Sequence, residues 1–344
     1  MTASIRIGIV GAGANTRLRH IPGFRAIAGV ELAGVVNSSP ASSARAASEF
    51  DIPKTYSDWR ELIADPDIDA VMIGTWPNLH AEIACAALEH GKHVLTEARM
   101  ARNLDEAKAM HAASVAAPDL IAQIVPSPFG LREHDFVTEQ IENGVLGEVR
   151  ELTILGANDQ FYDATQPLHW RQDRAISGNN LLAMGILHEA AMRWAPSTTR
   201  VFAQTTTFQP TLPGANGPVK VTVPDSAQVV TQLSNGGRGL YHLSGCALFG
   251  PGLHIHLYGS LGTFKLQLAP DPGLWFGRAG DKALRLVEIP ENLIGGWRVE
   301  EEFIGAIRGE EPVRFTTFDD GLAYMQFTEA VASSAQTGQV VDLN

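Results

Sequence analysis

Two glycines, Gly11 and Gly13, stand just behind the apolar run Ile5–Val10, and the segment after them has the apolar spacing of a helix. A glycine at the first position permits a tight turn, and one at the second lets the backbone approach a pyrophosphate at the amino terminus of a helix. Thr16 stands where the usual fingerprint has a third glycine, and a plain structural turn is the competing interpretation. Because a strand precedes the loop and a helix follows it, we favour a dinucleotide site. Its predicted loop residues are Gly11, Gly13, Ala14, Asn15 and Thr16.

The end of the second predicted strand bears on which coenzyme this site takes. Asn37, Ser38 and Ser39 stand there, without the aspartate or glutamate that usually holds a ribose 2′-hydroxyl. Nothing at this position repels a 2′-phosphate, although the serines are equally typical of a turn and a helix cap. Further groups that could bind a 2′-phosphate are Ser42, Arg17 and Arg45. The site is therefore predicted to take NAD or NADP, with NADP slightly favoured.

Strands and helices alternate through the first 125 residues, which must position this loop. Such alternation requires right-handed crossovers and gives a parallel sheet with helices on both faces. We predict an NAD(P)-binding domain of the doubly wound α/β (Rossmann) type at residues 1–125. Its predicted strands are 5–10, 30–36, 69–74, 92–95 and 120–125, and its predicted helices are 14–27, 42–50, 82–90 and 102–117.

The rhythm changes after Pro126. Short apolar runs joined by Gly, Pro and Asn turns predict a C-terminal α+β domain, residues 126–344, with a large and mostly antiparallel sheet. The last predicted helix, 319–337, could also pack back on the first domain. The predicted helices are 136–143, 180–194 and 319–337, and the predicted strands are 200–209, 219–223, 227–232, 239–244, 253–258 and 263–268.

The bulk composition excludes several classes of partner. The 344 residues carry a formal net charge of −12 and no basic stripe, so nucleic acid is excluded and a small molecule is expected. No apolar run is long enough to cross a bilayer, and the first residues lack the apolar core of a signal peptide. Cys85 and Cys246 have no CxxC partner, as is usual in a reducing compartment. We expect a cytoplasmic protein that contacts no membrane.

Several blocks along the chain resemble the glucose-fructose oxidoreductase, inositol dehydrogenase and rhizopine catabolism (Gfo/Idh/MocA) family. They occur in the family's order from end to end, at residues 8–16, 75–80, 87–97, 144–148, 170–171, 177–178, 258–263 and 320–322. The resemblance implies a nicotinamide-dependent dehydrogenase or reductase acting on sugars, polyols or related cyclic alcohols. It also implies that the second domain holds the substrate on the open face of its sheet and forms homodimers or homotetramers through that sheet.

The sequence departs from the family where a catalytic lysine is usual. Members carry Glu-Lys-Pro after the strand that ends here at Thr96, whereas this chain has Glu97, Ala98 and Arg99. Alanine cannot transfer a proton. Arg99 stays charged, so it can anchor a carboxylate or phosphate but is a poor general base.

The family's second signature, Asp-x-Gly-x-His on a helix, is also altered. Alignment on Gly185 places the inert Ala183 and Leu187 at the aspartate and histidine positions. His188 lies one residue later, about 100° round the helix. It can serve as the acid/base if the helix is rotated or shifted, and a hydrogen-bonded structural histidine is the alternative.

A polar and aromatic cluster precedes this helix, as expected for loops that line a ligand pocket between the domains. Tyr162 and His169 are further acid/base candidates, and Trp170, Arg171 and Asn179 are candidates for contact with substrate. Packing is the competing role for Trp170.

A metal site is the alternative that His254 and His256 suggest, because residues two apart on a strand share a face. The sequence offers no third ligand at useful spacing, so we predict no metal.

Together these features predict an NAD(P)-dependent oxidoreductase that moves a hydride between nicotinamide and a sugar-like or cyclic hydroxyl or keto substrate. His188 would transfer the proton, and Arg99 and Arg171 would orient the substrate. The nicotinamide side would be lined by Thr75, Trp76, Pro77, His80, Glu97 and Ala98. Two other functions stay open: a lyase or glycoside-cleaving enzyme that uses tightly bound NAD transiently, and a non-catalytic nucleotide-binding protein.

Overall fold

The computed structural model describes residues 4–343, which form two compact units. The first unit runs up to Pro126 and takes in Arg298–Leu322, and the second comprises Ser127–Trp297 and the chain from Ala323 on. The predicted second domain, 126–344, thus includes a segment that packs with the first unit. The physical reason is local, because Thr317 bridges to Gln123 on an edge strand and the amide of Thr316 donates to the carbonyl of Ile124 at 3.2 Å.

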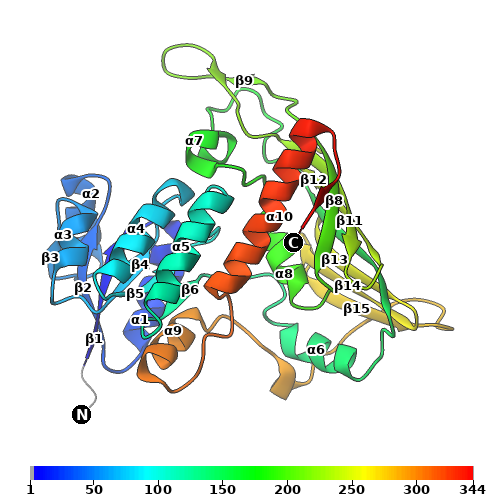
Figure 1. Ribbon diagram of the computed structural model, residues 1–344, viewed down its shortest axis with the longest axis horizontal. Coiled ribbons are helices and arrows are strands. Elements are labelled where there is room, and N and C mark those ends of the chain that lie inside the picture. Colours follow the sequence, from blue (N-terminus) through cyan, green and yellow to red (C-terminus); the bar gives the residue numbers. More distant parts are fainter. Residues whose placement is uncertain (1–3, 344) are drawn as a thin grey trace. The chain divides into compact units, whose positions relative to one another are not determined.

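The first unit is built on a six-stranded parallel sheet in the order β3-β2-β1-β4-β5-β6 (Figure 1). The order reverses between β1 and β4, so this sheet is doubly wound, as predicted. The two-residue strand β3 escaped the sequence analysis because it is too short to show periodicity. In sheet order the strands are β3 (Lys54–Thr55), β2 (Val30–Val36), β1 (Ile5–Val10), β4 (Ala70–Ile73), β5 (His93–Thr96) and β6 (Ala122–Ile124).

Capping residues set where several helices of this unit begin. The Ser39 side chain accepts from the amide of Ser42 and caps α2, and Asn103 caps α5 in the same way. One prediction was wrong in kind: the helix expected over 14–27 starts as a π-helix, η1, before it becomes α1. The helices are η1 (Thr16–His20), α1 (Ile21–Ala26), α2 (Pro40–Glu49), α3 (Trp59–Ala64), α4 (Pro77–Glu89), α5 (Leu104–Ala116) and α9 (Val299–Arg308), and α10 (Phe318–Thr337) begins here and continues into the second unit.

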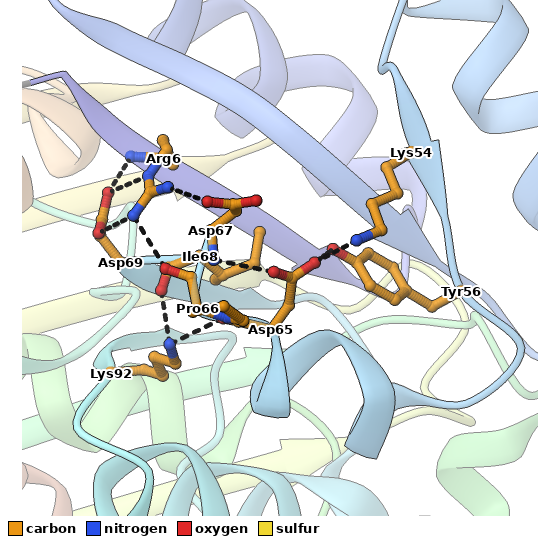
Figure 2. A network of polar contacts seen from close by, with 9 residues as sticks. All are labelled: Arg6, Lys54, Tyr56, Asp65, Pro66, Asp67, Ile68, Asp69 and Lys92. Atoms are coloured by element: carbon orange, nitrogen blue, oxygen red, sulfur yellow. Dashed lines mark hydrogen bonds and ion pairs between the residues drawn. The ribbon is translucent and has the colours of Figure 1, made fainter.

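A polar network fastens the turn that leads into β4 (Figure 2). Arg6 of β1 donates through Nε and Nη2 to the two carboxylate oxygens of Asp69, at 3.0 and 2.9 Å. Lys92 donates to the carbonyls of Asp65 and Ile68 at 2.9 and 2.7 Å, and Tyr56 donates to Asp65 at 2.6 Å. Arg6, Asp69 and Lys92 lie at the amino ends of β1, β4 and β5, opposite the edge at which doubly wound sheets bind ligands. The network therefore stabilises the fold rather than a site.

The second unit contains a nine-stranded sheet in which only the pair β7 and β12 is parallel among the described strands. Sequence analysis missed β7, the strand that joins the two halves of this sheet. It also predicted a strand over residues 219–223, whereas the structure has only the two-residue strand β10 there, which pairs with β9 in a separate two-stranded ribbon. In order the strands are β16 (Arg285–Leu286), β15 (Gly273–Arg278), β14 (Gly262–Ala269), β13 (Gly252–Gly259), β7 (Val149–Ala157), β12 (Arg238–Ser244), β11 (Ser226–Leu233), β8 (Thr198–Thr206) and β17 (Val341–Asp342), with the ribbon β9 (Thr211–Leu212) and β10 (Val219–Lys220).

Helices of the second unit bury an apolar core against one face of this sheet. Leu187 of α8 and Phe327 of α10 are fully buried with Tyr241 of β12. A buried ion pair fixes the start of this unit, because Glu189 accepts from Arg193 at 2.7 Å and from the amide of Ser127 at 2.7 Å. The helices are α6 (His134–Glu142), η2 (Trp170–Gln172), α7 (Arg174–Ser177), α8 (Met184–Met192) and η3 (Glu291–Leu293), with the second part of α10.

Candidate coenzyme site

The loop from β1 to η1 requires its glycines. Gly11 has φ +89°, and a Cβ there would lie 2.9 Å from the carbonyl carbon of Gly74 and the amide nitrogen of Thr75. A Cβ on Gly13 would lie 3.2 Å from the Gly74 carbonyl oxygen. The loop thus crosses directly over the end of β4 with no room for side chains.

Thr16, at the position of the usual third glycine, packs against Gly74, the residue that follows β4. The Thr16 hydroxyl donates to the carbonyl of Gly11 at 3.2 Å, and a Cβ on Gly74 would stand 2.1 Å from that hydroxyl oxygen. Gly74 is therefore a site residue that the sequence analysis missed. Its only sequence signal is its place at the end of the third apolar run.

Backbone amides at the start of η1 form an anion cradle. The amide of Gly13 donates to Gly11 and that of Arg17 to Gly13, at 2.9 and 3.0 Å. The amides of Ala14, Asn15 and Thr16 lie in the first turn of the helical segment, where backbone amides have no acceptor within the helix. Unpaired amides at a helix start bind phosphate, helped by the helix dipole. The predicted loop residues thus fit a dinucleotide pyrophosphate.

The residues predicted for the ribose end are largely occupied with local structure. Asn37 accepts from the amide of Ala12 at 2.7 Å and donates to the carbonyl of Ser42 at 3.0 Å, so it holds the phosphate loop in place. Ser39 caps α2, while Ser38 is exposed.

Arg17 is engaged as well. Its Nε donates to the carbonyl of Ala12 at 2.9 Å, and its Nη1 pairs with Glu49 on α2. Arg45 is exposed. The guanidinium of Arg17, a candidate to bind a 2′-phosphate, is thus already paired with the carboxylate of Glu49.

Glu97, at the end of β5, belongs to a buried ionic cluster that sequence analysis did not foresee. Its Oε1 accepts from Asn15 at 2.6 Å and lies 3.1 Å from Nε2 of His20, whose Nδ1 contacts Glu300 of α9. The His20 side chain is fully buried, and those of Glu300 and Glu97 are 5% and 17% exposed. Residues 77 and 280 positions from His20 come together here, and no local pattern signals such a contact.

The two carboxylates make His20 a cation at neutral pH. Burial alone lowers the pKa of His20, but the hydrogen bonds to Glu300 and Glu97 outweigh it and raise the pKa to about 9. Burial alone would raise the pKa of Glu97, yet the hydrogen bond and charge of His20 hold it below its usual value. Glu97 is therefore ionised across the physiological range.

His80 joins two loops at this edge of the sheet. Its Nδ1 lies 2.9 Å from the carbonyl oxygen of Arg99 and its Nε2 lies 3.0 Å from that of Thr75. The ring is fully buried, and burial lowers its pKa. His80 therefore ties the loop after β4 to the loop after β5.

The other residues predicted for the nicotinamide side differ in exposure. Trp76 is 52% exposed, Pro77 begins α4, and the amide of Ala98 donates to Oε2 of Glu97 at 3.2 Å. Arg99 is buried.

The structure places His188 in the core of the second unit. Its Nδ1 lies 2.7 Å from the hydroxyl of Tyr241, and its ring stacks on Phe327 with centroids 3.7 Å apart. Burial lowers the pKa of His188 to about 3. These contacts favour the structural alternative over proton transfer.

The residues predicted from Tyr162 to Asn179 differ in their contacts. The His169 ring lies 5.6 Å from Trp170, the Arg171 guanidinium lies 4.1 Å over the Trp170 ring, and Tyr162 is 50% exposed. Asn179 accepts from Arg174 of α7 at 2.7 Å and donates to Glu329 of α10 at 2.9 Å. Burial, with a contribution from Arg171, lowers the pKa of His169, so this ring is neutral at pH 7.

Neither metal nor membrane features are found in the described part of the chain. His254 and His256 have ring nitrogens 3.4 Å apart, but no group of three or more His, Cys, Asp or Glu side chains within residues 4–343 is arranged to hold a metal ion. In the same range no helix has both the length and the apolar character needed to span a bilayer.

Comparison with protein families places both units. Residues 5–122 match the model of the oxidoreductase family with an NAD-binding Rossmann fold, and residues 134–265 match the Gfo/Idh/MocA C-terminal domain. The chain belongs to the Gfo/Idh/MocA oxidoreductase family. The resemblance seen in the sequence and the doubly wound fold of the coenzyme domain are thereby confirmed.

Three curated relatives of this Gfo/Idh/MocA chain are named as dehydrogenases or reductases of levoglucosan, 1,5-anhydro-D-fructose and myo-inositol. Levoglucosan dehydrogenase of Pseudarthrobacter phenanthrenivorans is 36% identical over 43% of this chain and 38% of its own length. The 1,5-anhydro-D-fructose reductase of Ensifer adhaerens is 30% identical over 54% of each chain. Myo-inositol 2-dehydrogenase of Thermotoga maritima is 26% identical over 75% of this chain and 74% of its own length. The chain thus spans 38% of the length of the first relative and 54% of the length of the second.

Solved structures of the family extend the similarity to nearly the whole chain. Levoglucosan dehydrogenase in complex with NADH and L-sorbose superposes with a TM-score of 0.88 at 25% identity, covering 99% of both chains. An oxidoreductase domain protein from Kribbella flavida superposes with a TM-score of 0.87 at 23% identity and supports the fold alone.

Proposed function

We propose that this protein is an NAD(P)-dependent oxidoreductase that transfers a hydride between nicotinamide and a hydroxyl or keto group of a sugar-like or cyclic substrate. The observation that carries the proposal is the glycine-lined loop followed by the three amides of the first helical turn, in a chain of this family. The names of the dehydrogenase and reductase relatives support the substrate class.

Within this function, the first unit binds and orients the coenzyme. The amides of Ala14, Asn15 and Thr16 would hold the pyrophosphate, and Glu97 would accept a hydrogen bond from the nicotinamide half. A bound nicotinamide coenzyme would supply the hydride acceptor or donor. We propose that this side is lined by Thr75 and Trp76 after β4, by Pro77 and His80 of α4, and by Ala98 after β5.

The proton has to pass through a residue other than His188, which we assign to packing. We propose His169, with Tyr162 as a second candidate. The Nδ1 of His169 accepts from the amide of Arg171 at 3.2 Å, so in the neutral ring Nε2 carries the proton. An Nε2–H suits donation to a ketone oxygen as it is reduced. Arg99, Arg171, Trp170 and Asn179 remain the proposed substrate contacts.

The 2′-phosphate preference is proposed to be weak. No carboxylate stands at the end of β2 to repel a phosphate, which favours NADP, but Arg17 is already paired with Glu49 and Asn37 holds the loop. We therefore replace the slight preference for NADP with similar use of NAD and NADP, within about tenfold in Kd.

The decisive experiment measures binding and turnover separately. Calorimetric titration with NADH and NADPH tests the site, and loss of coenzyme absorbance with a panel of keto sugars and oxidised polyols tests the reaction. Uptake of neither coenzyme would overturn the proposal. Tight binding without any hydride exchange would support a non-catalytic nucleotide-binding protein instead.

A second function has one observation in its favour. Ala98 stands where the family carries a lysine, and its amide contact with Glu97 supplies no side-chain acid or base. A lyase or glycoside-cleaving enzyme that oxidises and then reduces its substrate on retained NAD does not depend on net dehydrogenation. Product release without net change in coenzyme absorbance would favour this version.

We also propose that copies of the chain associate through the open face of the nine-stranded sheet and that the protein works in the cytoplasm. Phe202, Val230 and Leu240 are directly paired across β8, β11 and β12, and they are 37%, 50% and 48% exposed. Such an apolar row on a sheet face suits a homo-oligomer interface. The free thiols of Cys85 and Cys246 suit a reducing compartment.

A further inference from the structure

Three ionisable side chains meet in the interior of the first unit. His20 closes η1, Glu97 follows β5, and Glu300 lies in the first turn of α9. Burying such groups is costly unless each is paired, and apolar residues of similar size often stabilise a fold as well or better. A buried ionic cluster near a ligand edge is therefore a candidate for function.

A neutral imidazole can donate to only one of two carboxylates, whereas an imidazolium can donate to both. His20 contacts Glu300 through Nδ1 and Glu97 through Nε2, the latter at 3.1 Å. With its pKa near 9, His20 carries one positive charge between two negative ones at neutral pH. The cluster then has a net charge of about −1.

Glu97 is the member of the cluster that remains within reach of a ligand. Its side chain is 17% exposed, against 0% for His20 and 5% for Glu300. Oε1 accepts from Asn15 and lies by His20, and Oε2 accepts from the amide of Ala98 at 3.2 Å. A carboxylate has about four acceptor positions, so one more donor can be accommodated.

The position of Glu97 on the sheet identifies that donor. Asn15 contributes both an amide of the phosphate cradle and a side chain that grips Glu97 at 2.6 Å. In a doubly wound sheet the adenosine half lies toward β2, so the nicotinamide half lies on the other side of the loop, toward β4 and β5. Glu97 follows β5 and therefore lies on the nicotinamide side.

We propose that His20 is a positioning residue that holds the Glu97 carboxylate against the nicotinamide half of the coenzyme, where its negative charge favours the oxidised ring over the reduced one. The oxidised ring carries a positive charge that the reduced ring lacks, so a fixed carboxylate nearby discriminates between them. This inference rests on the proposed function.

The first test compares affinities for NAD⁺ and NADH in the full-length protein by calorimetry or by nucleotide fluorescence. Glu97→Gln keeps the shape and removes the charge, and we expect it to lower the ratio of NAD⁺ to NADH affinity by about 5- to 10-fold. The matched control is Glu301→Gln, one residue beyond Glu300 on α9, whose side chain is 56% exposed. It should leave the ratio unchanged.

The second test separates positioning from simple structural support. His20→Gln leaves two buried carboxylates without their shared cation, so one of them should take up a proton as the pH falls. Besides the two carboxylates of the cluster, His80 acts on Glu97, and burial lowers the pKa of His80 and so keeps it neutral. As the pH is lowered from about 8 to about 6, we expect the ratio of NAD⁺ to NADH affinity to fall in the variant. The ratio of the wild-type protein should stay constant over the same range.

The outcomes are distinct. If Glu97→Gln binds both coenzymes with the wild-type ratio, the inference is overturned while the proposed function stands. If the wild-type protein binds neither coenzyme, both fail. Should His20→Gln not fold, His20→Asn, which likewise leaves the two carboxylates without their cation, replaces it in the pH series, and the Glu97→Gln ratio still decides the charge effect.

Discussion

Replacement of Gly11 by alanine tests the phosphate cradle most directly. Two effects add at this position. A residue with a side chain is strained at φ +89°, at a cost of about 1 kcal/mol in folding free energy. The new Cβ would also lie 2.9 Å from backbone atoms of Gly74 and Thr75, so the loop has to move away from β4.

The movement should weaken coenzyme binding more than folding. Hydrogen bonds to a charged group are worth about 1.5–3 kcal/mol each, and misalignment of one cradle amide therefore raises the Kd for NADH by about 10- to 100-fold. Calorimetric titration gives this Kd, and thermal unfolding without coenzyme gives the stability.

Gly91 provides the matched control in the same unit. It has φ +73°, and a Cβ there would meet nothing within 4 Å. Gly91→Ala should share the conformational strain, about 1 kcal/mol, and leave the Kd unchanged. Equal NADH affinity in the Gly11 and Gly91 variants would refute the assignment of the loop as the pyrophosphate site.

Three further predictions concern stability, proton transfer and assembly. His188→Asn should lower the melting temperature, because the side chain loses its contacts with Tyr241 in the core. Coenzyme binding and the pH profile of turnover should not change. A shifted pH profile would instead support His188 as the acid/base. Hydrogen bonds from Lys54 and Tyr56 hold the pKa of Asp65 in the folded protein well below its value in the unfolded chain. Asp65 therefore contributes fully to stability above about pH 4, and this contribution is lost as the pH falls through the lower, folded pKa. Asp65→Asn should make the stability less dependent on pH in acid, as followed by circular dichroism, and an unchanged acid unfolding curve would contradict this reasoning. Val230→Lys should convert oligomers to monomers in light scattering, whereas an unaltered mass would exclude this sheet face as the interface.

The sequence by itself determined the architecture of the coenzyme domain. Alternation of apolar runs and helical spacing predicted five of its strands because each lies wholly inside one short buried segment. The glycine pattern likewise predicted the phosphate loop, since the need for glycine at Gly11 arises from a backbone angle set within a few residues.

Only the tertiary structure decided how the polar groups are used. His20 and Glu300 are 280 residues apart, and whether a buried histidine is a cation depends on what packs against both of its nitrogens. Gly74 joined the candidate site because Thr16 lies over it, and the contact of the His188 ring with Phe327 favours a packing role for that histidine. Pairings between distant segments fix burial and charge, and helical or strand periodicity carries no information about them.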